Sequence, residues 1–280
     1  MRARDWWSSH VYLLAGLAWA AVVVGALTFG FVSVLRHIVW ASAMPGRAMV
    51  APWLWGVALT LGLALCLFWY RVGLGIASYR AQQRRMSIAL AARLRPLSQD
   101  LPRTLTQTAD WYLVSDEGER YALTWGLLRC RVAISESLWI TLDPAAQRAV
   151  LFHEALHAQV RDPLQQVILK VLSDALRPLG LGVLYPRYLV QREINADKRA
   201  LAACQGDDLP LLTALQAAVG ANPESVSYVG LAGALDARLH YLETHQTPDW
   251  PPSSLAIRLG LSLGAVLVTL TEGLLVWCHW

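Results

Sequence analysis

The stretch AVLFHEALHAQVRD, residues 149–162, places His153 and His157 four positions apart, with Glu154 directly after the first histidine. On a helix, residues at this spacing share one face, so both imidazoles can reach the same ion. HExxH supplies two ligands of a catalytic zinc and a glutamate placed to take a proton from its water. The alternative is two histidines that share a helix face by coincidence. A third ligand decides between these hypotheses, because catalytic zinc takes three from the protein.

The residues around this stretch predict the helix that the motif needs. Asp143 can cap its N-terminus, and Pro144 suits its first turn. Asp162-Pro163 ends the pattern, so the predicted helix covers about 144–161.

The stretch QREINADKRA, residues 191–200, offers the third ligand. Glu193 and Asp197 lie four apart on a second predicted helix, over about 187–204. Two carboxylates at this spacing repel each other on a bare helix, and a cation between the two helices would remove that repulsion. A solvated acidic pair, balanced by neighbouring basic residues, is the alternative. Together with HExxH, the pair favours a metal.

The composition indicates a membrane protein. The 280 residues are 55% hydrophobic and only 16% charged, against about 25% charged in ordinary soluble domains. Residues 11–35 and 52–70 carry no charge, and each reaches the ~20 residues that cross a bilayer. A third apolar segment, 259–278, is interrupted only by Glu272, which we expect to reach the outer interface. We predict about three transmembrane helices, the first being a retained anchor and not a cleaved signal.

Arginines gather directly after the second span, between Arg71 and Arg95, and this bias marks the cytoplasmic side. We therefore expect a multi-pass protein of the cell (inner) membrane with three parts: an N-terminal transmembrane hairpin (1–76), a cytoplasmic domain (77–252) and a C-terminal transmembrane helix (253–280). The basic charge comes with no nucleic-acid motif, so we expect contact with the lipid bilayer and no direct nucleic-acid binding. The four cysteines show no ligand spacing and are expected to be reduced packing residues.

The cytoplasmic part is predicted to contain a small β-sheet. Residues 111–115 and 120–124 flank a turn at Gly118 and predict a β-hairpin, and 130–135 predicts a third strand. Before them, residues 77–95 have the pattern of a basic helix lying along the membrane surface.

Two further segments are predicted to be helical. Residues 166–190 are apolar but contain several charges, which favours an interfacial helix or a shallow hairpin over a span. A last helical stretch is expected over 227–245.

HExxH followed by ExxxD, in a domain between membrane spans, resembles the gluzincin-type membrane metallopeptidases, most closely the BlaR/MecR-type antirepressor proteases. The similarity covers about 110–245. HtpX-type and CAAX-prenyl endopeptidases, which act in membrane protein quality control and processing, share both motifs and are the next best match. The resemblance implies an α-helical membrane protein with an α+β gluzincin-type zinc metallopeptidase domain, built from a small β-sheet and the HExxH helix.

The resemblance also implies roles for individual residues. His153, His157 and Glu193 would bind one Zn²⁺ ion, and Glu154 would be the general base and acid. Asp197 would accept the other ring N–H of a ligating histidine.

Other parts of the domain are given roles by the same resemblance. Arg238 is a candidate for ordering the acidic cluster or stabilising the oxyanion, and His240 competes for that role. An extended substrate would lie along an edge strand, formed by Arg131, Val132, Ala133, Ile134 and Ser135.

These features predict an integral-membrane zinc endopeptidase that cleaves a cytoplasmic or membrane-proximal protein, in regulated proteolysis or signalling. By resemblance, the substrate would be a transcriptional repressor or another signalling protein. The alternative from a different class is a non-catalytic membrane scaffold or sensor that keeps the metallopeptidase fold. Glu154 favours the enzyme, because a structural zinc needs no general base. Neither lysine lies three residues after a serine, so the S-x-x-K nucleophile of the β-lactam-sensing members is missing.

Overall fold

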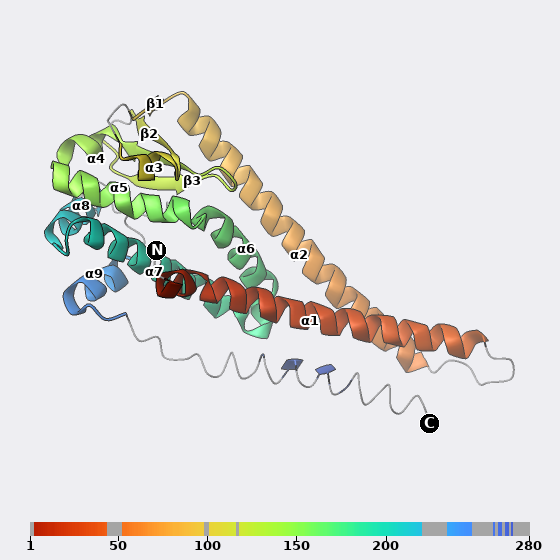
Figure 1. Ribbon diagram of the computed structural model, residues 1–280. Helices are drawn as coiled ribbons and strands as arrows, with labels where there is room; N and C mark the ends of the chain where they lie inside the picture. The colour runs from red at the N-terminus through yellow and green to blue at the C-terminus, as the bar shows by residue number, and fades with distance from the viewer. Residues whose placement is uncertain are drawn as a thin grey trace. The chain divides into compact units, whose positions relative to one another are not determined.

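The structure is a computed structural model in which the chain divides into two compact units (Figure 1). The described residues are 3–43, 52–97, 101–115, 118–219, 234–247, 260, 263–264, 267–268 and 270. One unit, which we call the motif unit because it carries HExxH, comprises residues 1–13, 78–168 and 185–250. The other, which we call the apolar unit, comprises residues 14–77, 169–184 and 251–280.

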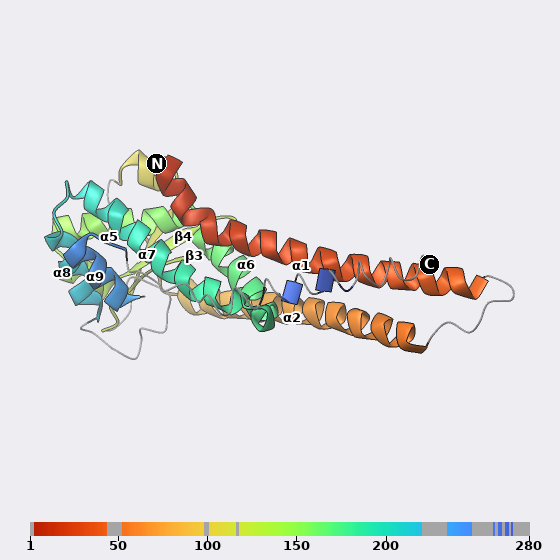
Figure 2. The same cartoon turned by 90° about the horizontal axis from the view of Figure 1, so that it is seen from below.

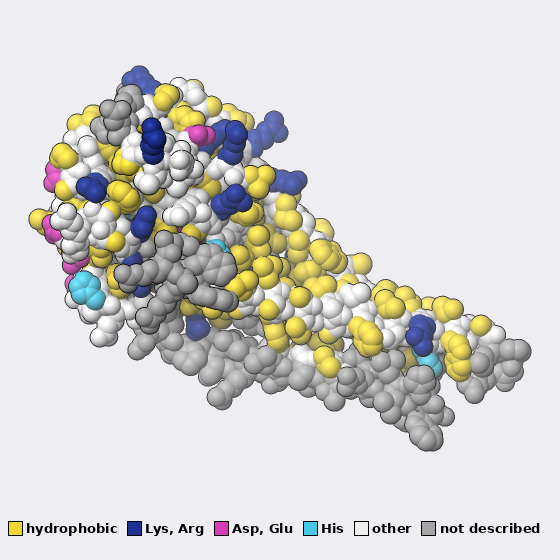
Figure 3. All heavy atoms as spheres, viewed as in Figure 1, with side chains coloured by type: hydrophobic (Ala, Val, Ile, Leu, Met, Phe, Trp, Pro, Cys, Tyr) yellow, Lys and Arg dark blue, Asp and Glu magenta, His cyan; other side chains and the backbone are white. Residues whose placement is uncertain are grey.

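Two long helices, α1 (Ala3–Ala43) and α2 (Pro52–Ala91), contain the predicted spans. By length and composition, both are able to cross a membrane. Where the apolar unit is coloured in Figure 3, many of its visible side chains are hydrophobic. The separate surface helix predicted over 77–95 is wrong, because α2 continues unbroken through Gly73 and Gly75 to Ala91. Glycine weakens a helix without ending it, and no proline follows to stop it earlier.

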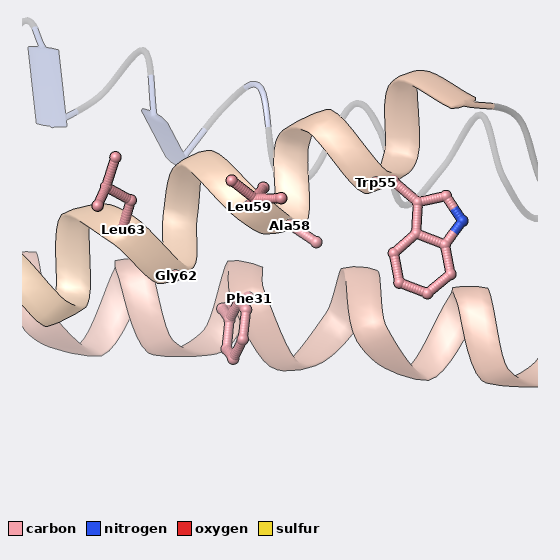
Figure 4. Close-up of a pocket in the computed structure, with 6 residues that line it drawn as sticks. All are labelled: Phe31, Trp55, Ala58, Leu59, Gly62 and Leu63. Atoms are coloured by element: carbon pink, nitrogen blue, oxygen red, sulfur yellow. The ribbon is translucent and has the colours of Figure 1, made fainter.

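Within the apolar unit, α1 and α2 pack through small residues. A Cβ atom at Gly62 of α2 would lie 3.2 Å from the ring of Phe31 on α1. The two helices leave a shallow apolar pocket of about 410 Å³ between them (Figure 4). It is lined by Phe31, Trp55, Ala58, Leu59, Gly62 and Leu63.

The segment predicted as an interfacial helix or shallow hairpin is a helical hairpin. α6 (Asp162–Ala175) leads through two 3₁₀ turns, η1 (Arg177–Leu179) and η2 (Leu181–Val183), into α7 (Leu184–Ala203). Its position relative to a bilayer stays a prediction. The third predicted span, 259–278, lies largely outside the described residues, and Glu272 lies entirely outside them.

The motif unit contains a mixed four-stranded sheet of β1 (Leu94–Pro96), β2 (Asp110–Val114), β3 (Ala122–Trp125) and β4 (Arg131–Ser135). The strand order is β1-β2-β4-β3. β2 and β4 are parallel, with Trp111 opposite Val132, and the other two pairings are antiparallel.

This order corrects two predictions. The hairpin predicted from 111–115 and 120–124 is wrong, because β4 lies between β2 and β3. The strand 131–135 is also not an edge strand, because it pairs on both sides. Its residues 132–135 are all fully buried, and such a continuous buried run is typical of an internal strand. Among the described strands, the edges are β1 and β3.

The HExxH helix, α5 (Pro144–Gln159), lies across this sheet, in contact with β3 and β4 (Figures 1 and 2). The predicted start is confirmed, since Asp143 Oδ1 accepts a hydrogen bond from the backbone N–H of Ala146 at 2.7 Å. The helix ends two residues earlier than predicted. Arg161 then adopts a left-handed conformation with φ 54°, and α6 begins at Asp162.

Helices pack around α5 to complete the core of the motif unit. α8 (Leu209–Val219), which the sequence pattern did not predict, contacts α5 closely. α9 (Leu235–Thr244) lies inside the stretch predicted over 227–245, of which 227–233 is outside the described residues. Two short helices, α3 (Arg103–Thr106) and α4 (Glu136–Thr141), complete the unit.

Candidate metal centre

Two helices of the motif unit bring three predicted metal ligands to one point. α5 supplies His153 and His157, and α7 supplies Glu193. The Nε2 atoms of the two histidines lie 3.2 Å apart. Oε2 of Glu193 lies 3.3 Å from Nε2 of His153 and 3.8 Å from Nε2 of His157. All three side chains are buried, and together they form a group that can hold a metal ion.

The spacing and bonding of these atoms fit an ion at their centre. Nitrogen ligands at about 2.0–2.1 Å from a tetrahedral zinc lie about 3.3 Å from one another, close to the separations observed. Oε2 of Glu193 is buried, and no group among the described residues donates a hydrogen bond to it. The guanidinium of Arg238 is nearby, but its Nη1 lies 3.7 Å away. A buried carboxylate oxygen without a donor is costly unless a cation binds it.

The first histidine lies beside the second acidic residue of α7. Nδ1 of His153 lies 3.0 Å from Oδ1 of Asp197, so its Nε2 faces the ligand group. Arg238, from α9, donates through Nε to Oδ2 of Asp197 at 2.7 Å and through Nη2 to Oδ1. Arg238 and Asp197 are both fully buried. Arg238 and His240 are the two candidates for ordering the acidic cluster. Arg238 contacts this cluster, whereas His240 is exposed.

The second histidine has its own carboxylate, which sequence reasoning missed. Nδ1 of His157 is hydrogen-bonded to Oδ2 of Asp162, the first residue of α6. The phenol of Tyr188 donates to Oδ1 of the same carboxylate at 3.0 Å. Burial, together with the Asp162 carboxylate, raises the pKa of Tyr188 well above its usual value, so this phenol keeps its proton. From the sequence pattern, Asp162 is predicted only to mark the end of a helix.

Arg192 fixes one oxygen, Oε1, of the Glu193 carboxylate. Its Nε and Nη2 atoms both donate to Oε1 of Glu193, at 3.0 and 2.8 Å. Burial acts to raise the pKa of Glu193, but Arg192 and His157 outweigh it and hold that pKa well below its usual range. Glu193 is therefore ionised, with Oε1 occupied and Oε2 directed at the histidines.

Glu154, the residue predicted to be the general base, lies beside this group with one oxygen fixed. Thr124, on the edge strand β3, donates its hydroxyl to Oε2 of Glu154 at 2.7 Å. Oε1 is buried without a hydrogen-bond partner in the part of the chain that the structure describes. No pattern in the sequence pointed to Thr124, because its contact joins residues 30 positions apart.

Two carboxylates keep one histidine charged in the metal-free protein. Burial acts to lower the pKa of His157, but Glu193 and Asp162 outweigh it and raise that pKa to about 10. Arg238 holds the pKa of Asp197 below its usual value despite burial. A metal that binds His157 must therefore displace a proton.

The structure brings four of the predicted site residues together: His153, His157, Glu193 and Asp197. Among the described residues, the strand 131–135 contributes no side chain to the group His153, His157 and Glu193 or to the contacts described around it. We compared the chain with models of protein families, with curated proteins and with solved structures, and none of them matches it.

Proposed function

We propose that the chain is a zinc-dependent, membrane-associated endopeptidase of the gluzincin type. One observation carries the proposal: the ligand atoms of His153, His157 and Glu193 form a buried triangle whose sides are 3.2, 3.3 and 3.8 Å. Two imidazoles and one carboxylate are a common ligand set for catalytic zinc. The neighbouring Glu154 gives this group a base, which a structural zinc would not need.

Individual residues of the chain would have separate roles in peptide hydrolysis. When bound, zinc would lower the pKa of a coordinated water to about 7 and polarise the peptide carbonyl. Glu154 would accept the proton of the attacking water through its free Oε1 atom and pass it to the nitrogen of the leaving amine. Thr124 would hold Oε2, so that Oε1 stays directed at the reaction.

The substrate is expected along β3. The sequence predicts this role for strand 131–135, but the edge beside α5 belongs to residues 122–125. An extended peptide can add to such an edge through backbone hydrogen bonds, which are largely independent of its sequence. Because Thr124 lies on this edge, the peptide backbone and the general base would be positioned by the same strand.

The cellular role that we propose follows the resemblance to BlaR/MecR-type antirepressor proteases. The chain would cleave a repressor or another signalling protein at the cytoplasmic face of the inner membrane. α1 and α2 are long and apolar enough to hold the motif unit there. An HtpX-like or CAAX-like role in membrane protein processing would use the same chemistry on different substrates.

The test is the metal content and peptidase activity of the full chain, purified in detergent. We expect about one zinc per wild-type chain and a clear loss in Glu193→Ala. Glu154→Gln should keep the metal but cleave none of a mixture of quenched fluorescent peptides that the wild type cleaves. A wild-type chain without metal after reconstitution would overturn the proposal. Metal without cleavage of peptides or membrane-extracted proteins would favour the scaffold.

A further inference from the structure

The second predicted zinc ligand is held by a carboxylate that lies outside both sequence motifs. Asp162 is hydrogen-bonded through Oδ2 to Nδ1 of His157, and its other oxygen accepts a hydrogen bond from the phenol of Tyr188 at 3.0 Å. All three side chains are buried, and Tyr188 is only 1% exposed. The contact therefore joins α5, α6 and α7 at a point where solvent cannot compete for the hydrogen bonds.

A turn of the backbone brings Asp162 to this place. On a continuous helix, a residue five positions after His157 would lie about 140° around the axis from it. Instead, α5 ends at Gln159, and Arg161 adopts a left-handed conformation with φ 54°. A non-glycine residue rarely adopts that conformation, because its Cβ atom crowds the backbone. The chain then reverses, so that the first residue of α6 faces back onto the last turn of α5.

Each of the two histidines has a carboxylate beside its Nδ1 atom, and the two carboxylates come from different helices. His153 contacts Asp197 on α7, and that carboxylate is fixed by Arg238. His157 contacts Asp162 on α6, and that carboxylate is fixed by Tyr188. In both cases Nδ1 faces a carboxylate and Nε2 faces the ligand triangle. A carboxylate on the far ring nitrogen sets the tautomer and raises the basicity of a histidine ligand.

We propose that Asp162 is a positioning residue for metal binding by His157, and that Tyr188 holds Asp162 in place. This inference rests on the proposed metal site, and it assigns the site a second histidine–carboxylate pair beyond the ExxxD motif. It applies to the binding of the metal itself and does not depend on the identity of the peptide substrate.

The test is the zinc affinity of the full chain in detergent, measured by competition with a chelating dye. Loss of an outer carboxylate on a ligating histidine typically weakens metal binding about 10–100-fold. We expect a loss in this range for Asp162→Ala, about tenfold for Asp162→Asn, and a smaller, several-fold loss for Tyr188→Phe. Cobalt(II) substitution adds a spectroscopic readout, since a reoriented His157 changes the visible absorption of the bound ion.

Matched controls separate positioning from a general effect on the fold. Asp174→Asn removes an exposed carboxylate of the same helix, which forms a surface ion pair with Lys170 one turn earlier. Tyr185→Phe removes a phenol one turn before Tyr188 that accepts from Gln166. Both controls should bind zinc like the wild type and keep its cobalt spectrum.

The outcomes distinguish this inference from the proposed function. If the wild type binds zinc and Asp162→Asn binds it within twofold with an unchanged cobalt spectrum, the positioning role is overturned and the metal site stands. If the wild type binds no metal, both fail. Should Asp162→Ala fail to fold, Asp162→Asn and Tyr188→Phe decide, because each keeps the size of the side chain that it replaces.

Discussion

Thr124, on the edge strand β3, donates its hydroxyl to Oε2 of Glu154 at 2.7 Å. The residue that we propose as general base is thus fixed by the strand along which the peptide is expected to bind. A rigid connection of this kind sets the distance between the base and the peptide carbonyl, and misplacement by about 1 Å can cost about 100-fold in rate.

Replacing Thr124 by valine should therefore lower kcat and leave the metal in place. A hydrogen bond to a charged group contributes about 1.5–3 kcal/mol, so we expect a loss of about tenfold or more in kcat, with a smaller change in KM. Cleavage of a fluorescent peptide and zinc content are measured on the same preparation. Thr124→Ser, which keeps the hydroxyl, should recover most of the activity. Equal rates in the valine variant and the wild type would contradict this role.

Zinc binding should become tighter as the pH rises through neutrality. Glu193 and Asp162 raise the pKa of His157 to about 10 in the metal-free protein, whereas a metal binds only the neutral imidazole. One proton must therefore leave at pH 7, and the logarithm of the apparent affinity should rise by about one per pH unit between pH 6 and 8. Calorimetry in buffers of different ionisation enthalpy measures this proton directly. Zinc binding that releases no proton at pH 7 would refute the prediction.

The raised pKa of His157 also makes the stability of the metal-free fold depend on pH. This stability falls as the pH rises, whereas the zinc affinity increases. The folded pKa of His157 lies above the usual value of about 6.5. Its contribution to stability is therefore fully present below about pH 6.5 and is lost as the pH rises through about 10. Zinc-bound protein should not show this loss, because its imidazole is already neutral. Unfolding midpoints of both forms at pH 6 and pH 10 check the difference.

The candidate metal-binding group could be predicted from the sequence because the spacing of its residues is local. His153 and His157, like Glu193 and Asp197, lie four apart on helices, and a helix places such residues on one face whatever the rest of the chain does. Asp162 could not be predicted in this way, because its position depends on the left-handed turn at Arg161.

The arrangement of the sheet could not be predicted for a related reason. Strands 110–114 and 122–125 are consecutive and separated by a turn, which favours a hairpin locally. The strand 131–135, which is buried along nearly its whole length, instead lies between them and pairs with both. Strand pairing depends on burial across the whole sheet, and a local turn pattern does not contain that information.

Arg238 should be needed for folding, because its partner cannot be buried alone. Both Arg238 and Asp197 are fully buried and joined by two hydrogen bonds. Removing one member of a buried pair typically costs about 3–5 kcal/mol, and we expect this loss in the free energy of unfolding for Arg238→Met. The measurement is denaturant unfolding of the metal-free chain in detergent.

Two controls identify the cause of that loss. Arg129→Met, at an exposed position, should change the free energy of unfolding by less than about 0.5 kcal/mol. The double variant Arg238→Met with Asp197→Asn should recover part of the loss, since no buried charge is then left without its partner. A double variant no more stable than Arg238→Met would show that the lost packing, and not the unpaired carboxylate, causes the destabilisation.

A side chain at Gly126 should destabilise the protein, because Gly126 turns the chain directly after the edge strand. Its φ is 96°, and a Cβ atom there would lie 2.2 Å from the carbonyl oxygen of Arg129. Gly118 has a similar φ of 87° but nothing within 4 Å of its Cβ position among the described residues. Gly118→Ala should therefore cost about 1 kcal/mol, for the backbone conformation alone.

Gly126→Ala adds a collision with backbone to that conformational cost, so it should lose clearly more stability, about 2 kcal/mol or more. The displaced turn lies two residues after Thr124, so the hydrogen bond to Glu154 should loosen and peptide cleavage should fall. Zinc affinity should be kept, since the three proposed ligands come from α5 and α7. Denaturant unfolding, cleavage rate and zinc affinity of the two variants check this, and equal stabilities would show that the turn relaxes without cost.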